Sequence, residues 1–170
     1  MFGKLFLAIG ALITTVTAAT FSYTQTLTFV KTTVTSLNAF SNVPSQCFAT
    51  INVQQIQSTL PKVCSSADLI NYFEVQNEPQ NVATLFSFTG QVLGNLASSM
   101  TNCNLPEISS LVQSKSQELI NWSNQIKGGA PVSLSQVSVV NGLKSMTSSL
   151  EIGLINSAAY DFAESINYDM

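Results

Sequence analysis

Residues 47–64 read CFATINVQQIQSTLPKVC and contain two of the three cysteines in the 170-residue chain. The spacing of apolar residues such as Ile51 and Ile56 predicts a helix between Cys47 and Cys64. One helix between them would separate their Cα atoms by about 25 Å, at about 1.5 Å per residue. A disulfide requires Cα atoms within about 7 Å of each other. We therefore expect that these two cysteines do not bond to each other.

Cys103 is the predicted disulfide partner of Cys47. In an up-down bundle, the helix that follows Cys47 runs one way and the helix that precedes Cys103 returns, so the two cysteines lie side by side. A disulfide between Cys64 and Cys103 is the alternative. With the first pairing, Cys64 remains either as a buried thiol that behaves as a small hydrophobe or as a partner in an intermolecular disulfide.

The rest of the chain also has a helical pattern, because apolar residues recur every three or four positions. A strand is the alternative for the first turns, since FSYTQTLTF at 21–29 alternates apolar and polar residues. The sequence predicts an all-α fold, a single up-down bundle of five to six helices that occupies residues 19–170. The predicted helices span residues 21–42, 45–59, 65–76, 81–101, 104–126 and 133–160.

Proline and capping residues set the expected helix ends. Pro61 is expected to end the second helix near Thr59, because proline lacks the N–H that a helix interior uses. Ser65 and Asp68 have capping-box spacing and are expected to begin the third helix. The apolar face of this third helix would consist of Leu69, Ile70 and Phe73.

Two later helices have stronger start signals. Asn104 is the expected N-cap of the fifth helix, with Glu107 at its third position. KGGAP at 127–131 predicts a turn. Ser133 and Gln136 form the capping box that is expected to begin the last helix.

The N-terminus, MFGKLFLAIGALITTVTAAT, has the pattern of a secretory signal peptide over residues 1–18. Lys4 is a short basic region, residues 5–13 are apolar, and Val16–Ala18 fits the small-x-small cleavage rule. An uncleaved anchor is the alternative. Cleavage would leave no stable membrane span and would place the mature chain in the secretory pathway or outside the cell.

The composition excludes many kinds of chemistry, because the chain has no histidine and its six basic residues are all lysine. Triads that need histidine are therefore impossible, and three cysteines match no structural zinc pattern. Removal of Lys4 leaves five lysines against nine acids, so the net charge is 5 − 9 = −4, which disfavours nucleic-acid binding. We expect a protein that is not an enzyme and has no cofactor or metal.

Three further features are candidate sites. Asn121 begins the sequon NWS, which indicates either a glycan or an unused match. Gly90 and Gly94 form a Gly-x-x-x-Gly motif that predicts a close contact between two helices. Glu74 and Glu78 resemble a glycosidase carboxylate pair, but their polar surroundings favour solvated charges.

Two functional hypotheses follow from the sequence. The first is a secreted, non-enzymatic structural or protein-interaction protein, which would associate with itself as a homo-oligomer or with an extracellular protein partner. Its support is the scarcity of charge, because only 9% of the residues are charged and copies repel each other weakly. The alternative is an extracellular carrier that binds a lipid-like apolar ligand between its helices.

Overall fold

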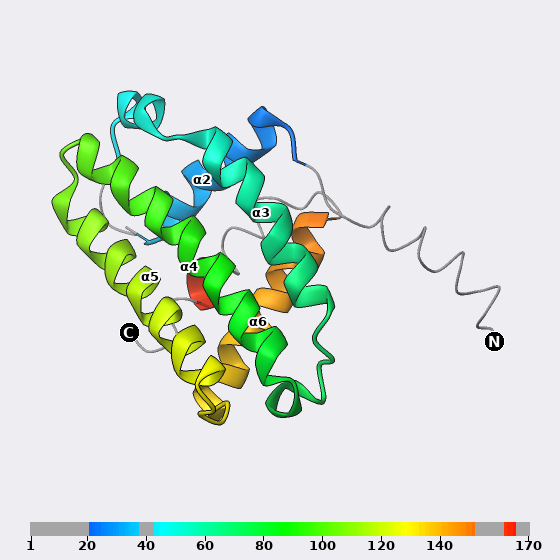
Figure 1. Ribbon diagram of the computed structural model, residues 1–170. Coiled ribbons are helices and arrows are strands. Elements are labelled where there is room, and N and C mark those ends of the chain that lie inside the picture. Colours follow the sequence, from blue (N-terminus) through cyan, green and yellow to red (C-terminus); the bar gives the residue numbers. More distant parts are fainter. Residues whose placement is uncertain (1–20, 38–42, 152–161, 166–170) are drawn as a thin grey trace.

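The computed structural model describes residues 21–37, 43–151 and 162–165, and the described residues contain helices and no strands (Figure 1). The α-helices are α2 (Tyr23–Leu37), α3 (Val53–Asp68), α4 (Pro79–Asn102), α5 (Pro106–Lys127) and α6 (Leu134–Glu151). Two short 3-10 helices are η1 (Ser45–Thr50) and η2 (Val75–Asn77). The predicted all-α bundle of five to six helices is therefore confirmed. The predicted signal peptide lies outside the described residues, as does the expected end of the last helix near residue 160.

Helix α4 lies at the centre of the bundle. It packs against α5 on one side and α3 on the other, and α3 also contacts α6 and α2. Helices α3 to α6 alternate in direction, which gives the up-down arrangement (Figure 1). Large side chains of α4 such as Phe86, Leu93 and Met100 are completely buried, so α4 supplies much of the common core.

The contact between α4 and α5 is unusually regular because small residues recur every seven positions on both helices. Three serine hydroxyls of α5 each donate a hydrogen bond to a backbone carbonyl of α4. The pairs are Ser109 to Ala97 (2.9 Å), Ser116 to Gly90 (2.7 Å) and Ser123 to Ala83 (2.7 Å). A side chain as short as serine reaches a neighbouring backbone only when the two helices approach closely, so these bonds both require and fix a short distance between them.

Gly90 has the closest contact in this hairpin. A Cβ atom at Gly90 would lie 2.8 Å from Cγ1 of Ile120 and 3.2 Å from the backbone oxygen of Ser116. At Gly94 the nearest atom would be the hydroxyl oxygen of Ser116, at 3.3 Å. Both glycines of the Gly-x-x-x-Gly motif therefore face α5, and Gly90 leaves no room for a side chain.

The turn between α4 and α5 corrects one expected helix start. Asn104 has a backbone φ of 60° and does not cap α5; the N-cap residue is Leu105. Asparagine tolerates this left-handed conformation better than most residues, and here it reverses the chain within a short connection. The neighbouring Cys103 forms the predicted disulfide with Cys47, and their Cα atoms are 5.3 Å apart.

Helix α3 corrects two further expectations. The segment that was expected to be one helix from residue 45 is η1 followed by α3, whose N-cap Asn52 accepts a hydrogen bond from the N–H of Gln55. Pro61 lies inside α3 and does not end it. Four buried residues at helical spacing span the proline, and their packing offsets the roughly 3 kcal/mol that an interior proline costs. They are Leu60, Val63, Cys64 and Ala67.

Capping boxes begin the first and last described α-helices. The Ser133 and Gln136 pair is confirmed, because each backbone N–H donates to the side-chain oxygen of the other residue, at 2.9 and 3.2 Å. Ser22 and Gln25 form the same pair before α2. The strand alternative for residues 21–29 is therefore wrong, since local capping and burial of the helical face favour α2.

We predict that Gly90→Ala destabilises the protein, although alanine favours helix by up to about 1 kcal/mol relative to glycine. The added methyl would push α5 away and lengthen the bond from Ser116 to the Gly90 carbonyl. The expected loss is about 1–3 kcal/mol in the free energy of unfolding, measured by urea denaturation. Gly94→Ala is the matched control and should cost less; an equal cost in both variants would contradict the role of Gly90.

Reduction of the Cys47–Cys103 disulfide should lower the free energy of unfolding by up to about 4 kcal/mol, because the bond closes a long loop in the unfolded chain. The measurement is urea denaturation with and without a reductant. The Cys103→Ser variant should match the reduced protein and should show no further response to reductant. A wild-type midpoint that is unchanged by reductant would contradict this prediction.

Candidate functional site

The most exposed large apolar side chain among the described residues lies in the connection between α3 and α4. We call residues 69–74 the aromatic loop. Phe73 is 92% exposed, Leu69 is 66% exposed and Tyr72 is 52% exposed. The rings of Tyr72 and Phe73 meet edge to face, with centroids 5.8 Å apart. Single exposed apolar residues are common, but three together on one loop make this loop a candidate interaction surface.

The loop replaces the third helix that the sequence predicts from Ser65. Helix α3 continues through Ser65 and ends at Asp68. The side-chain oxygen of Asn71 then accepts a hydrogen bond from the N–H of Phe73, at 2.9 Å. Such an Asx turn competes with helix for the same backbone groups. Of the expected apolar face, only Ile70 is buried, whereas Leu69 and Phe73 point into solvent.

Several contacts hold the loop in one conformation. The carboxylate of Glu78 accepts hydrogen bonds from the N–H of Asn71 at 2.9 Å and from the side-chain amide of Asn81 at 3.0 Å. Ile70 and Val75 are each 2% exposed and anchor both ends of the loop in the core. The exposure of the aromatic rings is therefore a property of an ordered loop and not of a loose one.

A second connection ties the same region to the far end of the α4–α5 hairpin. The side-chain amide of Gln76 donates to the carbonyl of Val132, at 3.1 Å, just before α6 begins. Gly129, in the turn after α5, has φ of 109°, which glycine adopts without strain. This turn brings the chain back to η2, so the region that follows the aromatic loop contacts the connection between α5 and α6.

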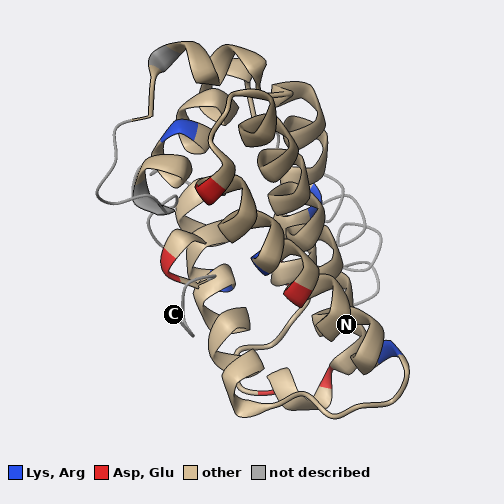
Figure 2. Ribbon diagram, turned by 90° about the vertical axis from the view of Figure 1, so that its left-hand side faces the viewer, with Lys and Arg blue, Asp and Glu red and all other residues tan. Residues whose placement is uncertain are grey.

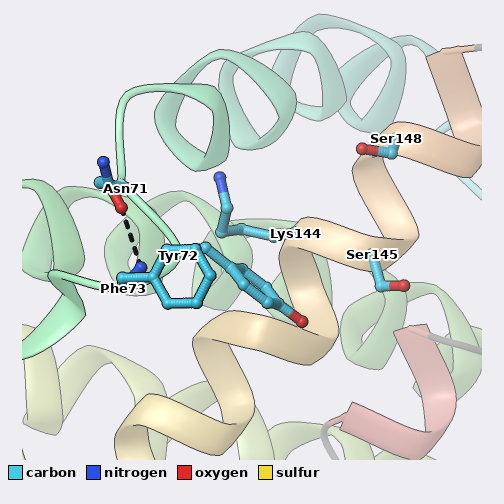
Figure 3. A pocket seen from close by; sticks show the side chains of 6 residues that line it. All are labelled: Asn71, Tyr72, Phe73, Lys144, Ser145 and Ser148. Carbon is cyan, nitrogen blue, oxygen red and sulfur yellow. Dashed lines mark hydrogen bonds between the residues drawn. The ribbon is translucent and has the colours of Figure 1, made fainter.

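An open hollow of about 530 Å³ lies between the aromatic loop and α6. Tyr72 and Phe73 stand together at its rim, and Lys144 extends from α6 toward α3 (Figure 3). The ammonium group of Lys144 donates to the carbonyl of Ala67 at 2.7 Å, where a cation stabilises the negative end of a helix. The remaining lining residues are Asn71, Ser145 and Ser148.

The sequon at Asn121 has one exposed and one buried polar side chain. Asn121 is exposed, but the hydroxyl of Ser123 is buried and donates to the Ala83 carbonyl. Trp122 packs on Phe86, with ring centroids 5.3 Å apart. A glycan on Asn121 would project into solvent, while the serine of the sequon already serves the α4–α5 contact.

The remaining candidate residues are Cys64 and the carboxylate pair Glu74 and Glu78. Cys64 is completely buried in α3, so its thiol would reach a second molecule only after local opening. Glu78 is engaged within the aromatic loop connection, and Glu74 is exposed beside it. Within residues 21–37, 43–151 and 162–165, no group of cysteine and carboxylate side chains has the arrangement of a metal site.

None of the helices in the described part of the chain is both long enough and apolar enough to cross a membrane. Comparisons with protein-family models, with curated proteins and with solved structures found no match for this chain. The aromatic loop must therefore be interpreted from its own chemistry.

The aromatic loop is not apparent from the sequence because helical spacing continues past Asp68. Asn71, located two residues before Phe73, was the available signal, since asparagine at that distance forms an Asx turn. The serines at seven-residue intervals in α5 were also missed. Their signal was the matching series of alanine and glycine in α4, which is visible in the sequence only when both segments are aligned in opposite directions.

We predict that Glu78→Ala makes the aromatic loop more sensitive to chymotrypsin, which cleaves after tyrosine and phenylalanine. Loss of about 1 kcal/mol of local hydrogen bonding should raise the cleavage rate roughly fivefold under native conditions. The measurement is the rate of cleavage after Tyr72 or Phe73, located by mass spectrometry. Glu118→Ala, which removes a carboxylate on α5 that pairs with Lys115, is the control; equal rates in both variants would contradict the role of Glu78.

Proposed function

We propose that the chain is a secreted, non-enzymatic protein-interaction domain whose aromatic loop contacts another protein. The observation that carries this proposal is the 92% exposure of Phe73 on a loop that is anchored at both ends. Exposure of a large apolar side chain to water is unfavourable. An ordered loop that maintains such exposure is suited to burial against a partner.

The geometry of the loop favours a protein as that partner. Aromatic residues contribute much of the energy at protein interfaces because each buries a large area with few rotatable bonds. Tyr72 and Phe73 already contact each other, and the hydrogen bonds of Asn71 hold the backbone between them. Little conformational entropy therefore remains to be lost when the loop is buried.

Secretion and the lack of catalysis are supported by the chemistry of the rest of the chain. A disulfide between Cys47 and Cys103 persists best in an oxidising compartment, in agreement with the signal-like pattern of the first residues. The lack of histidine and arginine in the sequence removes the side chains that most often act in acid–base catalysis and in anion binding.

A carrier for an apolar ligand is the second candidate. Its support is the hollow beside the aromatic loop, whose volume of about 530 Å³ lies in the range of small-molecule sites. Such sites enclose most of the ligand, whereas this hollow is open to solvent. The open shape favours the docking of a larger partner.

The test is native mass spectrometry of the full chain isolated from the medium of its own cells without detergent. We predict that the wild-type protein is recovered in a complex with another protein, and that the double variant Tyr72→Ser/Phe73→Ser is recovered alone. Tyr23→Ser removes a comparably exposed aromatic side chain from α2, where it is 56% exposed, and should leave the complex intact.

Two outcomes would contradict the proposal. A wild-type monomer that retains a small-molecule adduct would support the carrier instead. A complex that survives the double variant would show that the partner binds elsewhere. Circular dichroism and thermal unfolding of each variant would show that the fold is retained, as we expect for substitutions of exposed side chains.

A further inference from the structure

We infer that the aromatic loop docks a basic segment of its protein partner, in which lysine or arginine lies next to a large apolar side chain. The inference rests on the proposed function and specifies the chemistry of the partner. The apolar side chain would pack on Tyr72 and Phe73 at the rim of the hollow. The cation would pair with the acidic residues that flank them, Asp68 and Glu74.

Acidic residues are concentrated around the aromatic loop. Three of the nine acidic residues in the chain, Asp68, Glu74 and Glu78, lie within residues 68–78, although charged positions are few and scattered over the ribbon as a whole (Figure 2). Asp68 and Glu74 are exposed and directly adjoin Leu69 and Phe73 in the chain. Exposed carboxylates therefore border the exposed apolar residues of the aromatic loop along the chain.

The described cations do not neutralise these two carboxylates. The salt bridge found among the described residues joins Lys115 and Glu118, both on α5. Lys144 is the lysine that lines the hollow, and its ammonium group donates to the Ala67 carbonyl. It thereby balances the negative end of α3 and leaves Asp68 and Glu74 available for a cation from outside the molecule.

The same charges disfavour two other partners for the aromatic loop, a second copy of the chain and a membrane surface. In a symmetric contact whose two-fold axis passes through the aromatic loop, each loop would face its own copy, so that Asp68 and Glu74 would meet like charges. Membrane surfaces that carry anionic lipids attract lysine and arginine, and acidic residues beside the loop would be repelled by them. A basic polypeptide is the occupant that satisfies both the aromatic rings and the carboxylates.

The hollow offers a place for the apolar side chain of the partner. Its far wall on α6 consists of Lys144, whose ammonium group is bound to the Ala67 carbonyl, and of the exposed, uncharged Ser145 and Ser148. A backbone that lies across the hollow would meet these hydroxyls as hydrogen-bond partners. The apolar anchor point is thus the pair of rings at the rim, and the carboxylates of Asp68 and Glu74, which do not line the hollow, adjoin the aromatic loop in the chain.

The test uses a random peptide library displayed on phage as the probe. The library is selected on the full disulfide-bonded chain, after removal of phage that bind the Tyr72→Ser/Phe73→Ser variant. We expect the selected peptides to carry lysine or arginine within a few positions of a large apolar residue. Synthetic versions should bind the wild-type chain at least about tenfold more tightly than that variant.

Charge is then tested separately with the double variant Asp68→Asn/Glu74→Gln, which keeps the shape of both side chains. We expect it to weaken peptide binding by about threefold to tenfold. Raising the salt concentration from about 0.15 M to about 1 M should weaken binding to the wild-type chain but have little effect on this variant. Tyr23→Ser and Glu107→Gln, in α2 and α5, are the matched aromatic and acidic controls.

Four results would overturn the inference. They are selected peptides without basic residues, equal binding by the charge variant, the absence of any peptide that depends on the aromatic loop, and loop-dependent binding to vesicles or to a second copy. The proposed function is judged separately by the complex recovered from the medium. A complex that depends on the loop, together with peptides that lack basic residues, would keep the function and reject the charge requirement.

Discussion

The close approach of α4 and α5 is the constraint on which the rest of the structure depends. Each of three serine hydroxyls on α5 reaches a carbonyl on α4, and the pairs step along both helices by seven residues in opposite directions. A seven-residue repeat is slightly shorter than two turns of an ideal helix, so two such helices stay in contact by winding gently around each other. Each buried hydroxyl needs a hydrogen-bond partner. These three bonds therefore specify the register of α5 against α4 as well as the distance between the two helices.

The two ends of this hairpin position the remaining elements. At one end, the disulfide from Cys103 fixes Cys47 and η1, from which α3 starts. At the other end, the turn around Gly129 leads to Val132, which accepts the hydrogen bond from Gln76. This distant contact therefore holds the region next to the aromatic loop, in addition to the local hydrogen bonds of Asn71 and Glu78.

Helical spacing was sufficient to predict the fold class. The length of one helix excluded a Cys47–Cys64 disulfide, and the up-down arrangement favoured Cys47–Cys103 over the alternative Cys64–Cys103. The sequence did not predict that α3 continues through Pro61, or that Leu105 and not Asn104 caps α5. The packing of residues on both sides of Pro61 outweighs a local preference against proline, and the conformation of Asn104 depends on how α4 meets α5. The aromatic loop was hidden because the apolar spacing continues past Asp68, whereas the Asx turn at Asn71 and the bond from Lys144 to the Ala67 carbonyl, 77 residues away in the chain, favour the end of α3 there.

The chemistry of the chain also limits how it can recognise a partner. Its surface is rich in serine, threonine, asparagine and glutamine, whose short-range hydrogen bonds provide little long-range orientation. Its sequence has no arginine and no histidine, so it cannot supply a bidentate cation to an interface. Its long-range attraction comes from lysines and carboxylates, and salt screens this attraction over about 8 Å at physiological ionic strength. Asp68 and Glu74 adjoin the exposed Leu69 and Phe73 in the chain, so in our proposal the partner supplies the cation, next to the group that buries Phe73.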